Sequence, residues 1–136
     1  MAPNLGGSGG GIIWLSASET ISLNYSMLTV RGQHGKASQH YGSGGGAGGS
    51  IQIITRNIAG DAMLDLSGGD GSTNGGGGGS GGRFVSHLLH HFNATSINEQ
   101  SLRWNGTVQL DGGKGGSRSA TNKTLLAAAR EFAGDG

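Results

Sequence analysis

Four asparagines of the chain stand in the pattern Asn-x-Ser/Thr without proline at the middle position, which is the acceptor pattern for N-linked glycans. They are Asn24, Asn93, Asn105 and Asn122. Because this pattern marks surface loops of secreted proteins, these four side chains are the first candidates for chemistry. The sequence predicts covalent N-glycans at all four positions.

Three imidazoles lie close together between Ser86 and Phe92. His87 and His91 are four residues apart, so they share one face of either a helix or a strand, and this spacing can bind zinc. No carboxylate lies nearby in the sequence to complete such a site. We interpret these histidines as polar positions beside apolar neighbours, and we expect no metal site.

Carboxylates are the other candidates, because a polysaccharide hydrolase or lyase built on stacked strands needs them clustered on one strand face. Of the eight acidic residues, Asp61 and Asp65 lie close together in the sequence, and no base accompanies them. The stretches 68–71 and 111–115 lack the tandem nonapeptide repeat of calcium-binding β-rolls. We therefore expect no catalytic residues, no enzymatic activity and no cofactor.

The elements that position these side chains must be built from glycine, which supplies 31 of the 136 residues. A helix bundle is excluded, because each glycine inside a helix costs roughly 0.5–1 kcal/mol relative to alanine. Collagen is excluded by the single proline and by the lack of a three-residue glycine period.

The charges are nearly balanced, with a formal net charge of +1. Nucleic acids and anionic membrane surfaces attract clustered Lys and Arg, so we expect neither as a partner. The chain has no apolar stretch long enough to predict a membrane span, no cysteine for a disulfide, and no visible signal peptide at its start.

Two short patterns repeat along the chain. The pattern apolar-x-apolar-polar-Gly-x-x-Gly occurs at residues 28–35, 64–71 and 108–115. A glycine followed by a short apolar strand occurs at residues 11–17, at 49–55 and, more weakly, at 82–88. Self-similarity at roughly 20–50 residues is typical of stacked repeat architectures.

The apolar residues of these strands alternate, so that Ile13 and Leu15 share one face, as do Ile51 and Ile53. We therefore predict an all-β fold, a short parallel β-solenoid (β-helix) with glycine-rich corners. An antiparallel β-sandwich is the alternative, because the strands are also short enough for hairpins.

The glycines have two expected roles in this fold. In the runs 42–49 and 75–82 they would let neighbouring backbones approach closely, the alternative being a flexible linker. In the Gly-x-x-Gly patterns they would supply positive φ at the corners of the solenoid. These corner glycines are Gly32, Gly35, Gly68, Gly71, Gly112 and Gly115.

The end of the chain departs from the repeat. Residues 125–132 are good helix formers, and Gly134 follows as a stop signal. Solenoids need atypical ends to cover an open core. We therefore divide the chain into glycine-rich solenoid repeats over residues 1–116 and a C-terminal helical cap, or an arm that packs on a neighbour, over residues 117–136.

Residues 42–53, 64–71 and the glycine run that ends at Arg83 together resemble a repeat of large secreted glycoproteins of protists and algae. Those proteins form surface layers or fibres, some of them in flagellar hairs (mastigonemes), and the resemblance covers residues 6–116. It implies an extracellular or cell-surface location and a structural role.

These observations predict a structural protomer or segment of an extracellular, N-glycosylated filament or surface fibre. Its partners would be copies of itself or adjacent repeats, stacked through strand edges and glycine backbones. The alternative is a carbohydrate- or ice-binding solenoid adhesin that acts through a flat face. Regular threonine rows would favour that alternative, and the threonines of this chain follow no repeat register.

Overall fold

The computed structural model describes residues 5–89 and 102–117 of the chain. Within these residues it contains nine short strands and no helix, so the described part is all-β, as predicted. The strands are β1 (Ile12–Ser16), β2 (Thr20–Leu23), β3 (Met27–Thr29), β4 (Ser50–Thr55), β5 (Asn57–Gly60), β6 (Met63–Asp65), β7 (Arg83–Leu88), β8 (Leu102–Trp104) and β9 (Thr107–Gln109).

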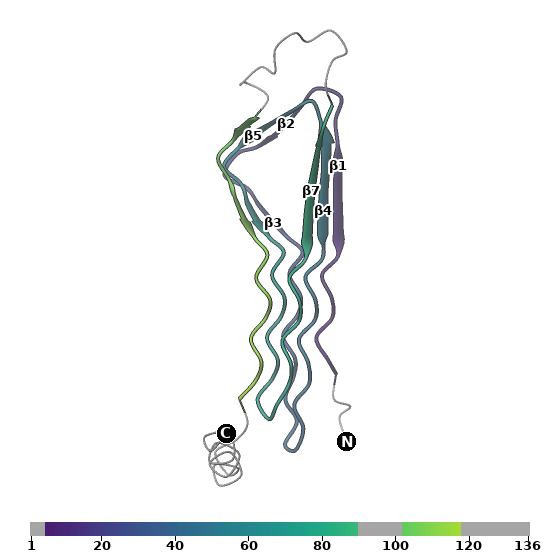
Figure 1. Ribbon diagram of the computed structural model, residues 1–136, viewed down its shortest axis with the longest axis vertical. Helices are drawn as coiled ribbons and strands as arrows, with labels where there is room; N and C mark the ends of the chain where they lie inside the picture. Colours follow the sequence, from purple (N-terminus) through teal and green to yellow (C-terminus); the bar gives the residue numbers. More distant parts are fainter. Residues whose placement is uncertain (1–4, 90–101, 118–136) are drawn as a thin grey trace, which may run out of the picture.

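The strands form three parallel sheets of three, in the orders β1-β4-β7, β2-β5-β8 and β3-β6-β9. The described chain therefore winds through three successive coils, which we define as coil 1 (residues 5–36), coil 2 (42–72) and coil 3 (76–89 and 102–116). The three sheets are the sides of a triangle (Figure 1). This arrangement is solenoid-like, and the antiparallel sandwich is excluded because each described pairing is parallel.

The register confirms the two sequence repeats. Ile51 in β4 pairs with Ile13 of coil 1 on one side and with Phe84 of coil 3 on the other. Leu64 in β6 pairs with Leu28 in the same way. Since residues in register share a face of a parallel sheet, the apolar positions of successive coils lie in rows.

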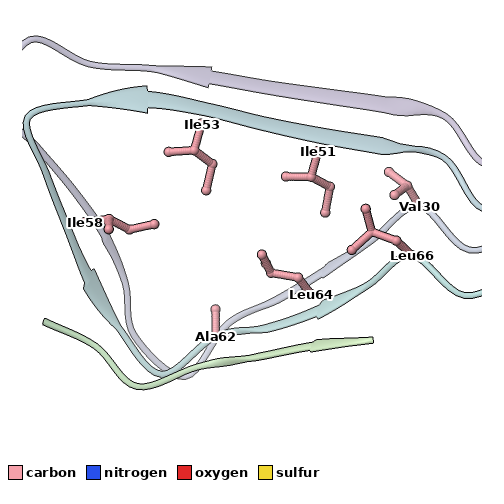
Figure 2. Close-up of a cluster of buried hydrophobic side chains, with 7 residues drawn as sticks. All are labelled: Val30, Ile51, Ile53, Ile58, Ala62, Leu64 and Leu66. Atoms are coloured by element: carbon pink, nitrogen blue, oxygen red, sulfur yellow. The ribbon is translucent and has the colours of Figure 1, made fainter. Parts of the chain in front are cut away.

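These rows meet inside the triangle and form its core (Figure 2). The buried members are Val30, Ile51, Ile53, Ile58, Ala62, Leu64 and Leu66. Most of them belong to coil 2, in which Ile51, Ile53 and Leu64 are completely inaccessible to solvent. Apart from the buried Val30 of coil 1 and the exposed Leu110 of coil 3, the equivalent side chains of coils 1 and 3 are only partly buried. The middle coil is sealed because it has a coil on each side.

Below the triangle, glycine-rich segments run side by side (Figure 1). Hydrogen bonds group them into two layers. The ascending layer leads into the first sheet and consists of residues 5–11, 42–49 and 76–82. The descending layer leaves the third sheet and consists of residues 30–36, 66–72 and 110–116. Asn74 and Gly75, at φ 70° and 95°, turn the chain from one layer into the other.

Backbone hydrogen bonds within each layer recur at every third residue. In the ascending layer the amides of Gly7 and Gly10 donate to the carbonyls of Gly44 and Ala47, both at 2.8 Å. In the descending layer the amides of Gly32 and Gly35, again three residues apart, donate to the next coil. Three residues per turn is the period of the polyproline II helix, whose backbone groups make no internal hydrogen bonds and can bond to neighbours.

A second set of hydrogen bonds joins the two layers. The amide of Gln33 donates to Ser8, that of Gly46 to Gln33, and that of Gly69 to Gly46, each at 2.8 Å. The series continues through Gly79 to Gly113. It follows one zigzag line across all three coils, so the glycine-rich half is held together in two directions.

Close approach, and not backbone flexibility, is the reason for most of the glycines. A Cβ added to Gly46, Gly69 or Gly79 would lie under 3.0 Å from a backbone carbonyl of the adjacent segment. One face of each ascending segment points to solvent instead, and there a Cβ on Gly77 would meet no atom within 4 Å. The runs 42–49 and 75–82 therefore bring backbones together, as predicted, and are not linkers.

The prediction that the Gly-x-x-Gly patterns supply positive φ at corners is wrong. Among the described residues, positive φ occurs at Tyr25, Gly60, Asn74 and Gly75. The six predicted corner glycines lie in the straight descending layer: Gly32, Gly35, Gly68, Gly71, Gly112 and Gly115. The first four are packed against carbonyls of the ascending layer. The predicted helical cap lies outside the described residues.

Gly77 and Gly79 provide a matched test of this packing, because they occupy the same segment. We expect Gly79→Ala to lower the free energy of unfolding by about 1–3 kcal/mol or more, because its Cβ would overlap the Gly46 carbonyl. Gly77→Ala should be neutral or raise it by about 0.4–1 kcal/mol, because alanine restricts the unfolded chain. Urea unfolding of both variants measures the difference, and equal effects would contradict close packing.

Candidate functional site

The described residues contain no group of three or more His, Asp or Glu side chains that could hold a metal ion. They also contain no helix of the length and apolar character needed to cross a membrane. His87 lies on the exposed face of β7, in register with Ile54. His90 and His91 lie outside the described residues, so the three imidazoles cannot be placed together. Asp61 precedes β6, Asp65 is the last residue of that strand, and the two carboxylates bond to different partners.

Two of the four predicted glycosylation sites lie at the same corner of the triangle. Asn24 follows β2 and Asn105 follows β8, and Asp61 follows β5 between them. The preceding residues of these three strands are in register, so the three side chains form one row along the solenoid. Both asparagines are exposed. Asn93 and Asn122 lie outside the described residues.

Local hydrogen bonds fix the backbone of this corner, and its side chains face solvent. The Asp61 carboxylate accepts the amide of Tyr25 at 2.7 Å, which ties the corner of coil 1 to that of coil 2. The hydroxyl of Ser26 donates to the Asn24 carbonyl at 2.8 Å. With φ 50°, Tyr25 turns its side chain outward, where it is 96% exposed. The exposed side chain of Asn24 donates from Nδ2, the atom that would carry a glycan, to the Ser22 hydroxyl at 3.1 Å.

A row of polar side chains follows the outer face of the descending layer. The amide of Asp70 donates to Nδ1 of His34 at 2.9 Å, and the amide of Lys114 donates to Oδ1 of Asp70 at 2.7 Å. Each side chain thus binds the backbone of the next coil. The hydrogen bond from Lys114 is the main reason why the pKa of Asp70 is lowered. This row follows the sequence repeat, which aligns His34, Asp70 and Lys114, although sequence reasoning gave it no role.

Asp65 makes a similar bond at the point where β6 becomes the descending layer. Its carboxylate accepts the hydroxyl of Ser67 at 2.5 Å and the amide of Ser67 at 3.0 Å. The hydroxyl bond is the largest cause of the lowered pKa of Asp65, and it outweighs the effect of burial, which raises it. The charged form of Asp65 therefore fixes the exit from the third sheet.

The remaining surface with functional potential is the pair of open ends of the coil stack. In coil 2 the amides of Gly45 and Gly68 donate to the next coil, at 2.9 Å and 2.8 Å. Their counterparts in coil 3, Gly78 and Gly112, donate to no following coil among the described residues. Unpaired edges of this kind are ready to bond to another chain.

No family model, curated protein or solved structure matches the chain. The corner row and the two coil edges are therefore the features from which a function can be proposed.

The Ser67–Asp65 bond predicts an acid-dependent loss of stability. Folding lowers the pKa of Asp65, so its contribution is fully present above the ordinary value of 3.8 and is lost as the pH falls through the lower folded value. Asp65→Asn keeps an oxygen acceptor for Ser67 but has no carboxylate to protonate. We therefore expect its unfolding free energy to decline less than that of the parent chain as the pH falls below 3.8. Asp111→Asn removes an exposed carboxylate and is the control. An unchanged decline in Asp65→Asn would refute the assignment.

Proposed function

We propose that this chain is a structural segment of an extracellular, N-glycosylated surface fibre, in which its coils continue a stack formed with neighbouring glycine-rich coils. The observation that carries this proposal is the difference between the coils. Ile51 and Leu64 of coil 2 are fully buried, whereas Leu28 of coil 1 and Val108 of coil 3 are only partly so. In solenoids each coil contacts only its neighbours, so an end coil is completed by whatever lies beyond it.

Solenoid ends are reactive because they combine apolar surface with unbonded backbone groups. The partly buried Leu28 and Val108 supply the apolar surface, and the edges of the two glycine layers supply the hydrogen bonds. Coil-on-coil contact satisfies both together, in the same geometry that joins coils 1 and 2 here. This favours an end-to-end mode of association.

The corner row supports the position of the glycans in such a fibre. Asn24 and Asn105 lie at one corner, and neither contributes a side chain to the coil-to-coil bonds. Glycans there would cover one corner along the length of the stack and would not cover the edges of the first and last coils. This arrangement would hinder sideways aggregation and permit growth along the stack.

Glycan occupancy tests whether the acceptor asparagines can be modified when the chain is secreted. We expect the full chain, secreted from a eukaryotic host behind an added signal peptide, to lose mass on treatment with peptide N-glycosidase. Asn24→Gln and Asn105→Gln should each remove one glycan, because both side chains are exposed. Intact-mass spectrometry measures the loss. Asn57→Gln, which changes an asparagine outside the acceptor pattern, is the control.

Immunogold labelling tests the structural role itself. Antibodies against the chain, applied to the cells that produce it, should label extracellular fibres or the cell surface. Labelling confined to the cell interior, or an unglycosylated chain, would overturn the proposal.

One observation favours the second candidate, a carbohydrate-binding adhesin. The outer face of the β1-β4-β7 sheet carries Trp14 at 68% exposure and Ile12 at 80% on β1, and Val85 of β7 is in the same row beyond Gln52. Exposed apolar patches of this kind often mark binding surfaces. If the chain acts in this way, Trp14→Ala should abolish its retention on cellulose or chitin beads, and retention equal to that of an unrelated protein would end the idea.

A further inference from the structure

The two ends of the glycine-rich half are not equivalent. At the start of the stack, two positions carry side chains where the following coils have glycine. Ser8 is equivalent to Gly46 and Gly79, and Gln33 is equivalent to Gly69 and Gly113, because they occupy the same steps of the zigzag of hydrogen bonds. At the glycines of these steps an added Cβ would lie only 1.9–2.1 Å from a backbone carbonyl oxygen.

The Cβ at these steps points toward the preceding coil. A Cβ on Gly46 would overlap the carbonyl of Ser8, and one on Gly79 would overlap the carbonyl of Gly46. By the same repeat, the Cβ of Ser8 itself would overlap the Gly79 carbonyl of any copy stacked before it in register. Gln33 would collide with the Gly113 carbonyl of that copy in the same way. Coil 1 therefore cannot follow another coil of this chain.

The side chain of Gln33 also supplies the hydrogen-bond acceptor that a preceding coil would otherwise provide. In coils 2 and 3, the amides of Gly46 and Gly79 donate to a carbonyl of the preceding coil at 2.8 Å. Within the described part of the chain no carbonyl of a preceding coil faces coil 1, and the amide of Ser8 donates instead to the side-chain oxygen Oε1 of Gln33 at 3.3 Å. The side chain of Gln33 thus caps a backbone group that would otherwise bond to an earlier coil.

The opposite end is prepared for a neighbour. Leu110 is equivalent to Val30 and Leu66, which are 5% and 0% exposed, yet Leu110 itself is 47% exposed. The coil that would cover it is absent from the described residues. The carbonyl of Gly113, the last step of the zigzag, also accepts no described backbone amide.

The glycines at this end need a neighbour to explain them. At Gly32 and Gly68 a Cβ would lie under 3.0 Å from a carbonyl of the following coil. At the equivalent Gly112 the nearest atom would be 3.4 Å away, and at Gly115 it would be 3.8 Å away, both ordinary contact distances. Within this chain alone these two positions accept a side chain, although the repeat keeps them as glycine.

We infer that the stack grows in one direction: its start is capped by Ser8 and Gln33, and the edge formed by Leu110, Gly112 and Gly115 receives a further glycine-rich coil that has glycine at the positions of Ser8 and Gln33. That coil belongs to an adjacent repeat and not to an identical copy, whose first coil carries the cap. The inference deepens the proposed stacking role by naming which edge binds and what it binds.

Removing the cap tests the inference with the full chain. Ser8→Gly/Gln33→Gly should convert the protein into head-to-tail oligomers, seen as a severalfold rise in sedimentation coefficient, whereas the parent chain should form none. Ser8→Ala/Gln33→Ala is the matched control, because it removes the hydrogen bond and keeps both Cβ atoms; it should not assemble. Adding Gly112→Ala and Gly115→Ala to the uncapped variant should abolish assembly without lowering the thermal unfolding midpoint.

Three results would overturn the inference: an uncapped variant that stays folded and monomeric, a parent chain that polymerises equally, or assembly that is unaffected at Gly112 and Gly115. If the double variant does not fold, Gly112→Ala/Gly115→Ala in the parent chain provides a second test: the thermal unfolding midpoint should not fall, because neither Cβ meets a close neighbour within this chain, and a lowered midpoint would also overturn the inference. Polymerisation of the parent would refute the cap and leave the proposed stacking role intact, whereas an intracellular, unglycosylated chain would refute that role alone.

Discussion

The structure depends on one steric constraint: in its glycine-rich half, neighbouring backbones lie too close together to admit a Cβ between them. Hydrogen bonds run within each layer and between the two layers, so the inner segment 42–49 is bonded to two segments of its own layer and to two of the other layer. At Gly46 and Gly69 a side chain would overlap a carbonyl of the adjacent segment. Glycine loses more conformational freedom on folding than any other residue. Here dense backbone hydrogen bonding compensates for that loss, and the half without side chains is ordered without a core of its own.

The two halves support one another because they share the same coils. The triangle has an apolar core that is small, with complete burial concentrated in coil 2, and it sets the register of the sheets through rows such as Ile13, Ile51 and Phe84. That register continues without a break between the sheets and the glycine layers. Ser50 of β4 and Arg83 of β7 directly follow the glycine runs and are already paired in register. A one-residue slip would turn the apolar side chains out of the triangle and the solvent-facing positions of the glycine layers into the packed interior.

The sequence was informative where side chains alternate and silent where glycine replaces them. The pairing of Leu28 with Leu64 and the alternation around Ile51 were readable, because their apolar residues have a strand's period of two. The polyproline II period of three was hidden, because solvent-facing positions such as Gly77 are also glycine. In the descending layer that period is present as the three-residue spacing of the Gly-x-x-Gly patterns, with polar residues such as Asp70 between the glycines. The corner glycines were misassigned for the same reason: Gly-x-x-Gly looks like a turn, and only the second layer reveals it as a packing repeat.

The exceptions to the glycine pattern carry more information about assembly than the pattern itself. A glycine at a packed step shows only that a neighbour must be close, whereas a side chain at such a step shows that no neighbour can be. Ser8 and Gln33 are such side chains, and the bond from the Ser8 amide to Oε1 of Gln33 occupies the backbone group that a preceding coil would use. Gly112 and Gly115 are the converse case, since they keep glycine where this chain supplies no neighbour. One edge of this solenoid is therefore blocked, and the other can accept a further coil. A fibre that contains such a unit begins at that unit and lengthens from one end only.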